Sequence, residues 1–80
     1  MNGAEAQEVR HVLLASNDQY RQLANLHHVL DDRLHELTGK HYLTTTEQLE
    51  EVTLKKRKLA LKDQMERIAT DWVRGHPHES

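Results

Sequence analysis

The fold is best predicted from residues 54–63, which read Leu54-Lys55-Lys56-Arg57-Lys58-Leu59-Ala60-Leu61-Lys62-Asp63. Leucine and lysine lose little side-chain freedom in a helix, and the stretch contains neither glycine nor proline. It therefore predicts the middle of a long helix. Leu54 and Leu61 share one face of that helix, whereas Leu59 lies about 160° around it from Leu61. The stretch thus predicts a helix with two apolar sides.

The face that carries Leu54 and Leu61 belongs to a seam with alternating spacings of four and three residues: Leu54, Lys58, Leu61, Met65, Ile68 and Trp72. An earlier seam has the same spacing: Val9, Leu13, Ser16, Tyr20, Leu23, His27, Leu30, Leu34 and Leu37. Heptad spacing of this kind predicts helices that pack against one another. We therefore predict an all-α protein, an antiparallel, coiled-coil-like hairpin of two helices with a short N-terminal helical segment. The expected neighbours across the hairpin are Leu61 and Leu23, Met65 and Tyr20, Trp72 and Leu13, and Lys58 and His27.

Capping signals divide the chain, a single domain of residues 1–80, into three helices. The helices are expected at about 5–15, 17–38 and 45–73. A loop is expected at about 39–44, and a tail at 75–80. Ser16, with a glutamine three residues later, favours a capping box and a bend, although one helix passing straight through is the alternative. Gly39 is expected to end its helix in left-handed backbone. Thr44 and Glu47 predict a second capping box at the start of the last helix.

The small size of the chain favours self-association. An 80-residue domain rarely gains more than about 3–5 kcal/mol from its core alone. One hairpin partner cannot cover both apolar sides of the last helix. We therefore expect a second apolar stripe to pack against another copy, giving a homo-oligomer, with a dimeric helical bundle favoured; its residues are Leu49, Val52 and Leu59, together with Leu26 and Val29.

Composition excludes several classes of protein. The sequence contains no cysteine, so disulfide frameworks and thiolate metal sites are ruled out. It contains no apolar run approaching the roughly 18 residues that cross a bilayer, and its start does not resemble a signal peptide. We expect a cytoplasmic protein without membrane contact. The formal net charge of −2 gives no strong overall attraction to nucleic acid.

Histidine is frequent, with seven in the chain, and one group has ligand-like spacing. His28, Asp32 and His35 are four and three residues apart on one helical face, where zinc or nickel could be held with water completing the shell. The alternative is a solvated polar face opposite the leucine seam. We favour the solvated face and expect no metal or cofactor, with histidine-based metal binding as the alternative function. His76 and His78 in the tail are weaker candidates.

The basic run Lys55–Lys58 resembles a nucleic-acid patch, but consecutive residues of a helix point in different directions. We favour a solvated charged helix, with weak nucleic-acid binding as a further alternative. Lys62 is expected to pair with Glu66 one turn later. No glycine-rich phosphate loop or serine elbow is present, so we expect no catalytic residues and no enzyme activity. His27, the seam-facing histidine, is expected to pair with Asp31.

Residues 54–63 followed by Met65 resemble the hallmark of the YdcH-like family of small bacterial proteins, and His28-Val29-Leu30-Asp31 matches that family's His-x-Leu-Asp element. The chain departs from the pattern in having Tyr20 where phenylalanine is commoner, with no proline before it. The resemblance implies a small helical hairpin, often self-associating, in the bacterial cytoplasm. Its members have no known biochemical function, so no catalytic residue is carried over. We therefore expect a non-enzymatic module for self-association or for interaction with another protein.

Overall fold

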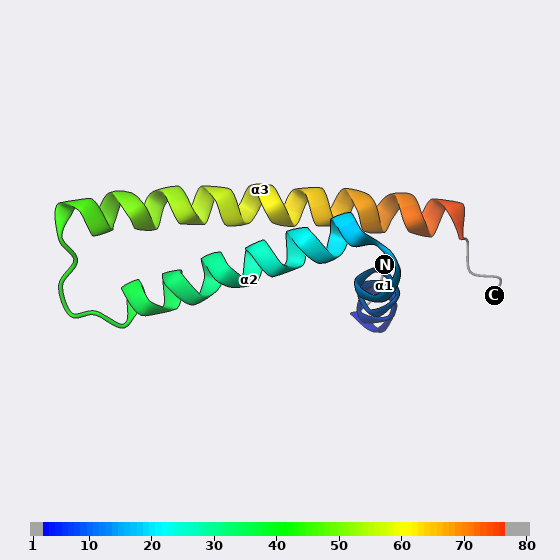
Figure 1. The fold of residues 1–80 in the computed structure, drawn as a ribbon, viewed down its shortest axis with the longest axis horizontal. Helices are drawn as coiled ribbons and strands as arrows, with labels where there is room; N and C mark the ends of the chain where they lie inside the picture. Colours follow the sequence, from blue (N-terminus) through cyan, green and yellow to red (C-terminus); the bar gives the residue numbers. More distant parts are fainter. Residues whose placement is uncertain (1–2, 77–80) are drawn as a thin grey trace.

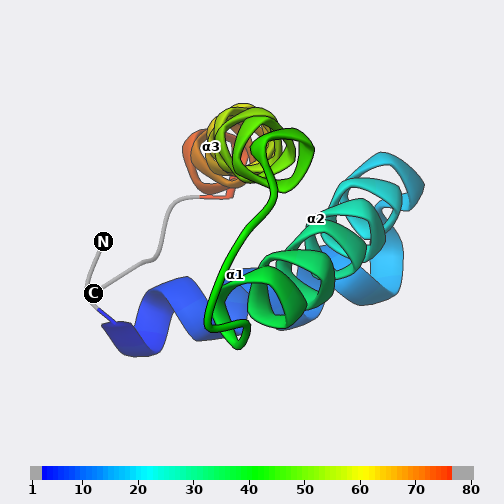
Figure 2. The ribbon, with the colours of Figure 1, turned by 90° about the vertical axis from the view of Figure 1, so that its left-hand side faces the viewer.

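The computed structural model describes residues 3–76, which form three helices and no strand: α1 (Gly3–Ser16), α2 (Asp18–Thr38) and α3 (Thr45–Gly75). Figure 1 shows α2 and α3 running antiparallel beside one another, with α1 at the end away from their connecting loop. The end-on view of Figure 2 shows α1 lying across the direction of the other two helices. The predicted all-α class is confirmed. None of these three helices has the length and apolar character required to cross a membrane.

The break between α1 and α2 is at Asn17, whose backbone is extended at φ −120° and ψ 109°. Its side-chain oxygen accepts a hydrogen bond from the Tyr20 N–H at 2.8 Å. The predicted bend is therefore confirmed, but the prediction of Ser16 as the N-cap was wrong. Ser16 is the last residue of α1, and its hydroxyl donates to the Val12 carbonyl at 2.6 Å. Because that hydroxyl is used by the preceding turn, Asn17 caps the new helix instead.

The loop between α2 and α3 starts without left-handed backbone. Gly39 has φ −77° and ψ −9°, so the left-handed prediction was wrong. The chain leaves α2 through a continuing right-handed turn, in which the Gly39 N–H donates to the His35 carbonyl at 3.1 Å. The other end of the loop follows the prediction: the Glu47 N–H donates to the Thr44 hydroxyl, and the Thr44 N–H donates to the Glu47 carboxylate, both at 3.1 Å.

Two helices extend slightly beyond their predicted limits. α1 begins at Gly3 instead of at about residue 5, and α3 continues to Gly75 instead of ending at about residue 73. At the end of α3 the His76 ring stacks on Trp72, with ring centroids 4.4 Å apart, and its Nδ1 lies 2.9 Å from the Trp72 carbonyl oxygen. These contacts hold the last turn of α3. Most of the predicted tail, including His78, lies outside the described residues.

Most of the core lies in two clusters at opposite ends of the α2–α3 pair, and Leu61 is buried outside both. The cluster near α1 buries Val9, Leu13, Tyr20 and Met65, with Leu23 and Trp72 packed against it. The cluster near the loop buries Leu34, Leu37 and Leu54. The predicted proximity of Met65 to Tyr20 and of Trp72 to Leu13 agrees with the first cluster. The apolar stripe of α1 thus packs on α2 and α3 beside the open end of the pair.

Candidate functional site

The predicted metal ligands do not converge. The His28 Nε2 lies 3.4 Å from an Asp32 carboxylate oxygen, whereas the His35 Nδ1 lies 3.8 Å from Asp31. The two histidines therefore use different carboxylates. Both imidazole side chains are largely exposed, and residues 3–76 contain no group of three histidine or acidic side chains placed to hold a metal ion. His76 lies at the C-terminal end of α3, where its ring stacks on Trp72.

The basic run Lys55–Lys58 is dispersed by its helix and partly neutralised. Lys55 pairs with Glu51 at 3.2 Å within α3, while Lys58 pairs across to Asp31 on α2. The two remaining members of the run are exposed on other sides of α3. The four cations therefore do not form one surface that would follow a phosphate backbone.

Lys58 lies near His27 as predicted, but its ion pair is with Asp31. The Lys58 ammonium donates to the Asp31 carboxylate, and this hydrogen bond lowers the pKa of Asp31. The predicted pair between His27 and Asp31 does not form, and the Asp31 carboxylate contacts Lys58 and His35 instead. Desolvation, followed by the charge of Lys58, lowers the pKa of His27, and nearby Arg10 and Lys62 act in the same direction. The neutral imidazole is therefore favoured in the folded chain.

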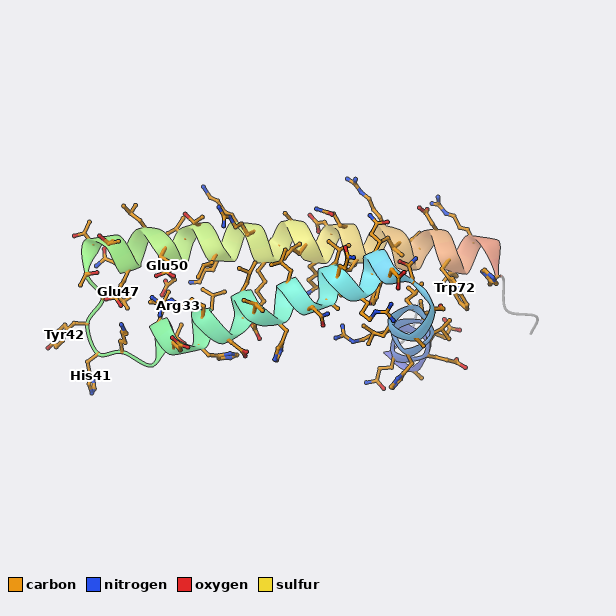
Figure 3. The ribbon with its side chains drawn as sticks, viewed as in Figure 1. Arg33, His41, Tyr42, Glu47, Glu50 and Trp72 are labelled. Carbon is orange, nitrogen blue, oxygen red and sulfur yellow. The ribbon has the colours of Figure 1, made fainter. Side chains whose placement is uncertain are left out.

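A second charged link between the long helices was not predicted. The Arg33 Nε lies 2.8 Å from one carboxylate oxygen of Glu50, and its Nη2 lies 2.9 Å from the other. Figure 3 shows these two side chains directed toward one another between α2 and α3. In the register that places Leu61 opposite Leu23, Arg33 lies within one residue of the position opposite Glu50. The opposite charges of these two residues beside the seam could therefore have been used to predict this ion pair from the sequence.

At the loop end of α3, Glu47 combines its capping role with an ion pair to Lys40. The hydrogen bond from Lys40, together with that from the Thr44 backbone, lowers the pKa of Glu47 to about 2. This pair ties the loop to the first turn of α3. In contrast, the side chain of Tyr42 in the same loop is directed away from the helices (Figure 3) and is 90% exposed.

The face of α3 that points away from α2 is apolar in part and uncovered. Leu49, Val52 and Leu59 are 66%, 51% and 61% exposed. Leu26 and Val29 on α2 are also exposed. At about 100° per residue, however, they lie on the flank of α2 that carries Arg33, and they do not continue the α3 stripe. The exposed apolar residues therefore form two separate surfaces instead of the single stripe that was predicted.

A groove of about 670 Å³ is lined by all three helices. Its apolar lining includes Ala6 from α1, Tyr20 from α2, and Met65 and Ala69 from α3. Four basic side chains also line it: Arg10, His27, Lys58 and Lys62. This groove could not be predicted from the sequence, because it depends on α1 lying across the other two helices.

Comparisons with known proteins identify the family. The family model described as "Protein of unknown function (DUF465)" matches residues 21–69, which is more than half of the chain. No curated protein and no solved structure shows significant similarity. The match covers α3 up to Ala69 and nearly all of α2, and the family is the YdcH-like family that the sequence resembles. The chain belongs to this family of proteins of unknown function.

Proposed function

We propose that this chain is a non-enzymatic self-association module that forms a homodimer through the outer face of α3, the surface around Leu49, Val52 and Leu59. The observation that carries the proposal is the exposure of these three side chains, each of which is more than half exposed. They are spaced three and seven residues apart, as expected for one stripe that faces another helix. Burying such a stripe in a second copy removes apolar surface from water and stabilises the dimer.

The amount of exposed surface supports a partner. The chain exposes 6234 Å², whereas a compact monomer of its 9.4 kDa mass exposes about 5,000 Å² by the usual scaling of area with mass. The radius of gyration of 15.7 Å likewise exceeds the roughly 12 Å of a compact 80-residue domain.

Charges on the same stripe favour one orientation. Lys56 and Asp63 continue the alternating spacing of three and four residues that connects Val52 and Leu59. A parallel, in-register pair of α3 helices would place Lys56 against Lys56 and Asp63 against Asp63, which is unfavourable. An antiparallel pair centred between residues 59 and 60 places Lys56 of each copy opposite Asp63 of the other. We therefore propose antiparallel pairing, with the apolar contact at Leu59 flanked by two ion pairs.

The non-enzymatic part of the proposal rests on the scattered placement of reactive groups. In the part of the chain that the structure describes, no histidine ring is hydrogen-bonded to a serine or threonine hydroxyl, and the candidate ligands His28 and His35 pair with different carboxylates. A location in the bacterial cytoplasm is proposed from the family resemblance. It is compatible with a sequence that has no cysteine.

Sedimentation equilibrium from low to high micromolar concentration tests the proposed dimer. We expect a mass that rises toward twice that of the chain for the wild type, and a monomer for Leu59→Glu, because the substitution buries a charge at the centre of the interface. Leu26→Glu is the matched control, since it introduces the same charge at an exposed leucine of α2 and should leave the dimer intact. A wild type that remains monomeric at high micromolar concentration contradicts the proposal.

Charge exchange tests the proposed orientation. Lys56→Glu and Asp63→Lys should each weaken the dimer, because each places two like charges opposite one another. The variant carrying both substitutions should recover the wild-type dissociation constant, since the pairs are restored with opposite sign. Failure of the double variant to recover would show that the two helices pair in another register or orientation, even if Leu59→Glu still abolishes association.

A further inference from the structure

We propose that the groove between α1, α2 and α3 binds a small anionic amphiphile, a medium-chain carboxylate whose acid group is held by Arg10 and Lys62 and whose alkyl chain lies along Tyr20, Met65 and Ala69. The groove volume of about 670 Å³ is within the range of about 300–1,000 Å³ that is typical of small-molecule sites. Leu49, Val52 and Leu59 of the outer face of α3 do not line this groove, so the proposed site does not depend on dimer formation.

The floor of the groove is apolar and already ordered. Tyr20 and Met65 are only 5% and 7% exposed and belong to the core cluster near α1. Ala6 and Ala69 line the groove from α1 and α3, and their small side chains leave the space open. An alkyl chain placed there would cover apolar surface without moving the core, and this lowers the conformational cost of binding.

The groove also contains cations that form no ion pair with the described residues. Lys58 is paired with Asp31, but Arg10 and Lys62 form no ion pair with any residue from 3 to 76. The predicted pair between Lys62 and Glu66 does not form, although Glu66 also lines the groove one turn away. Desolvation is the largest cause of the lowered pKa of His27; the charges of Lys58, Arg10 and Lys62 lower it further, and Asp31 opposes them.

Tyr20 supplies a further donor. Although Tyr20 is almost completely buried, its hydroxyl has no hydrogen-bond partner among the described residues, and it is not sealed from solvent. A buried tyrosine usually finds a partner for its hydroxyl. In the groove a carboxylate would accept this hydrogen bond while pairing with the cations, and a charge-assisted bond of that kind is stronger than a neutral one. A carboxylate therefore fits the polar groups better than a neutral head group does.

The direct test titrates octanoate, 1-octanol and inorganic phosphate separately into the full chain by calorimetry, with Trp72 fluorescence as a second readout. Trp72 packs against the core cluster that forms the groove floor, so its emission should report occupancy. We expect octanoate to bind about tenfold more tightly than 1-octanol, which corresponds to the contribution of one charge-assisted hydrogen bond. Equal affinity for octanol, or phosphate binding as tight as octanoate binding, overturns the proposal.

Variants assign the binding to the groove. Lys62→Gln and Arg10→Gln should each weaken octanoate binding by about threefold to tenfold through the loss of one charged partner, and both sites are exposed, so the fold should persist. Arg57→Gln removes a cation from an exposed position of α3 that does not line the groove, and it should leave the affinity unchanged. Ala6→Leu fills the groove from an exposed position of α1 and should abolish binding while circular dichroism retains the helical signal. Unchanged binding in Ala6→Leu overturns the proposed location.

Discussion

The Arg33 guanidinium on α2 binds both carboxylate oxygens of Glu50 on α3, through Nε at 2.8 Å and Nη2 at 2.9 Å. A two-point contact of this kind fixes orientation as well as distance, because the planar guanidinium matches the planar carboxylate. It raises the pKa of Arg33 and lowers the pKa of Glu50. Together with Lys58 and Asp31, it provides two charged links between α2 and α3, one on each side of the seam.

A double-mutant cycle should detect the link between Arg33 and Glu50. We expect Arg33→Gln and Glu50→Gln each to lower the urea midpoint. The double variant should lose less stability than the sum of the two single losses, because either change alone removes the same contact. Glu36→Gln is the control, since Glu36 also contacts Arg33, at 3.0 Å, but only within α2. Strictly additive losses for Arg33 and Glu50 would show that their contact contributes nothing to stability.

Leu13→Ala should have the largest effect of the truncations at leucine positions in α1 and the first half of α2. Leu13 is 1% exposed and anchors α1 in the core cluster near Trp72. Removing a fully buried leucine side chain costs about 2–5 kcal/mol, which is comparable to the whole stability expected of so small a core, about 3–5 kcal/mol. Urea unfolding followed by circular dichroism measures the loss. Leu26→Ala, at a half-exposed position, should change stability by less than about 1 kcal/mol.

Acid sensitivity should depend on Glu47. Its pKa falls from 4.5 to about 2 in the folded chain, so the ionised form stabilises the fold above the unfolded value, and the contribution is lost as the pH falls from about 4.5 toward 2. Glu47→Gln keeps a side chain able to accept the Thr44 hydrogen bond but removes the charge. The variant should melt below the wild type at pH 7, and the two melting temperatures should converge toward pH 2. A constant difference between them across this range would contradict the prediction.

A second pH dependence should appear near neutrality. The pKa of His27 is lowered from 6.5 by desolvation and by Lys58, Arg10 and Lys62, with Asp31 opposing. Because the unfolded chain then binds a proton more readily than the folded chain, stability should decrease as the pH falls below about 6.5 and level off below the folded pKa. Asp31 does not interfere, since its pKa is lowered from 3.8.

Urea midpoints at pH 8, 7, 6 and 5 measure this effect. His27→Gln should reduce the slope of the midpoint against pH, whereas His28→Gln, an adjacent and exposed position on α2, should leave the slope as in the wild type. If both variants keep the full slope, His27 is not the group responsible. The comparison thus distinguishes the effect of the half-buried His27 from that of the exposed His28.

The sequence by itself determined the class of fold and the start of its longest helix. Alternating spacings of four and three residues at Leu54, Leu61 and Met65 predicted the seam, and Thr44 with Glu47 predicted the start of α3, because both signals depend only on residues close together in the chain. Left-handed backbone at Gly39 was wrongly predicted, since a helix can also end in a continuing right-handed turn.

Only the tertiary structure decided how distant residues meet. The partner of Asp31 is Lys58 and not His27, because the packing of α3 against α2 places an ammonium where a local pair was expected. The groove requires α1 to lie across the α2–α3 pair, and no spacing within the sequence specifies that angle. Residues 54–63 show both the contribution of the sequence and that of tertiary packing. Their periodicity gives the helix two apolar sides, and packing decides that Leu54 and Leu61 are buried while Leu59 stays exposed.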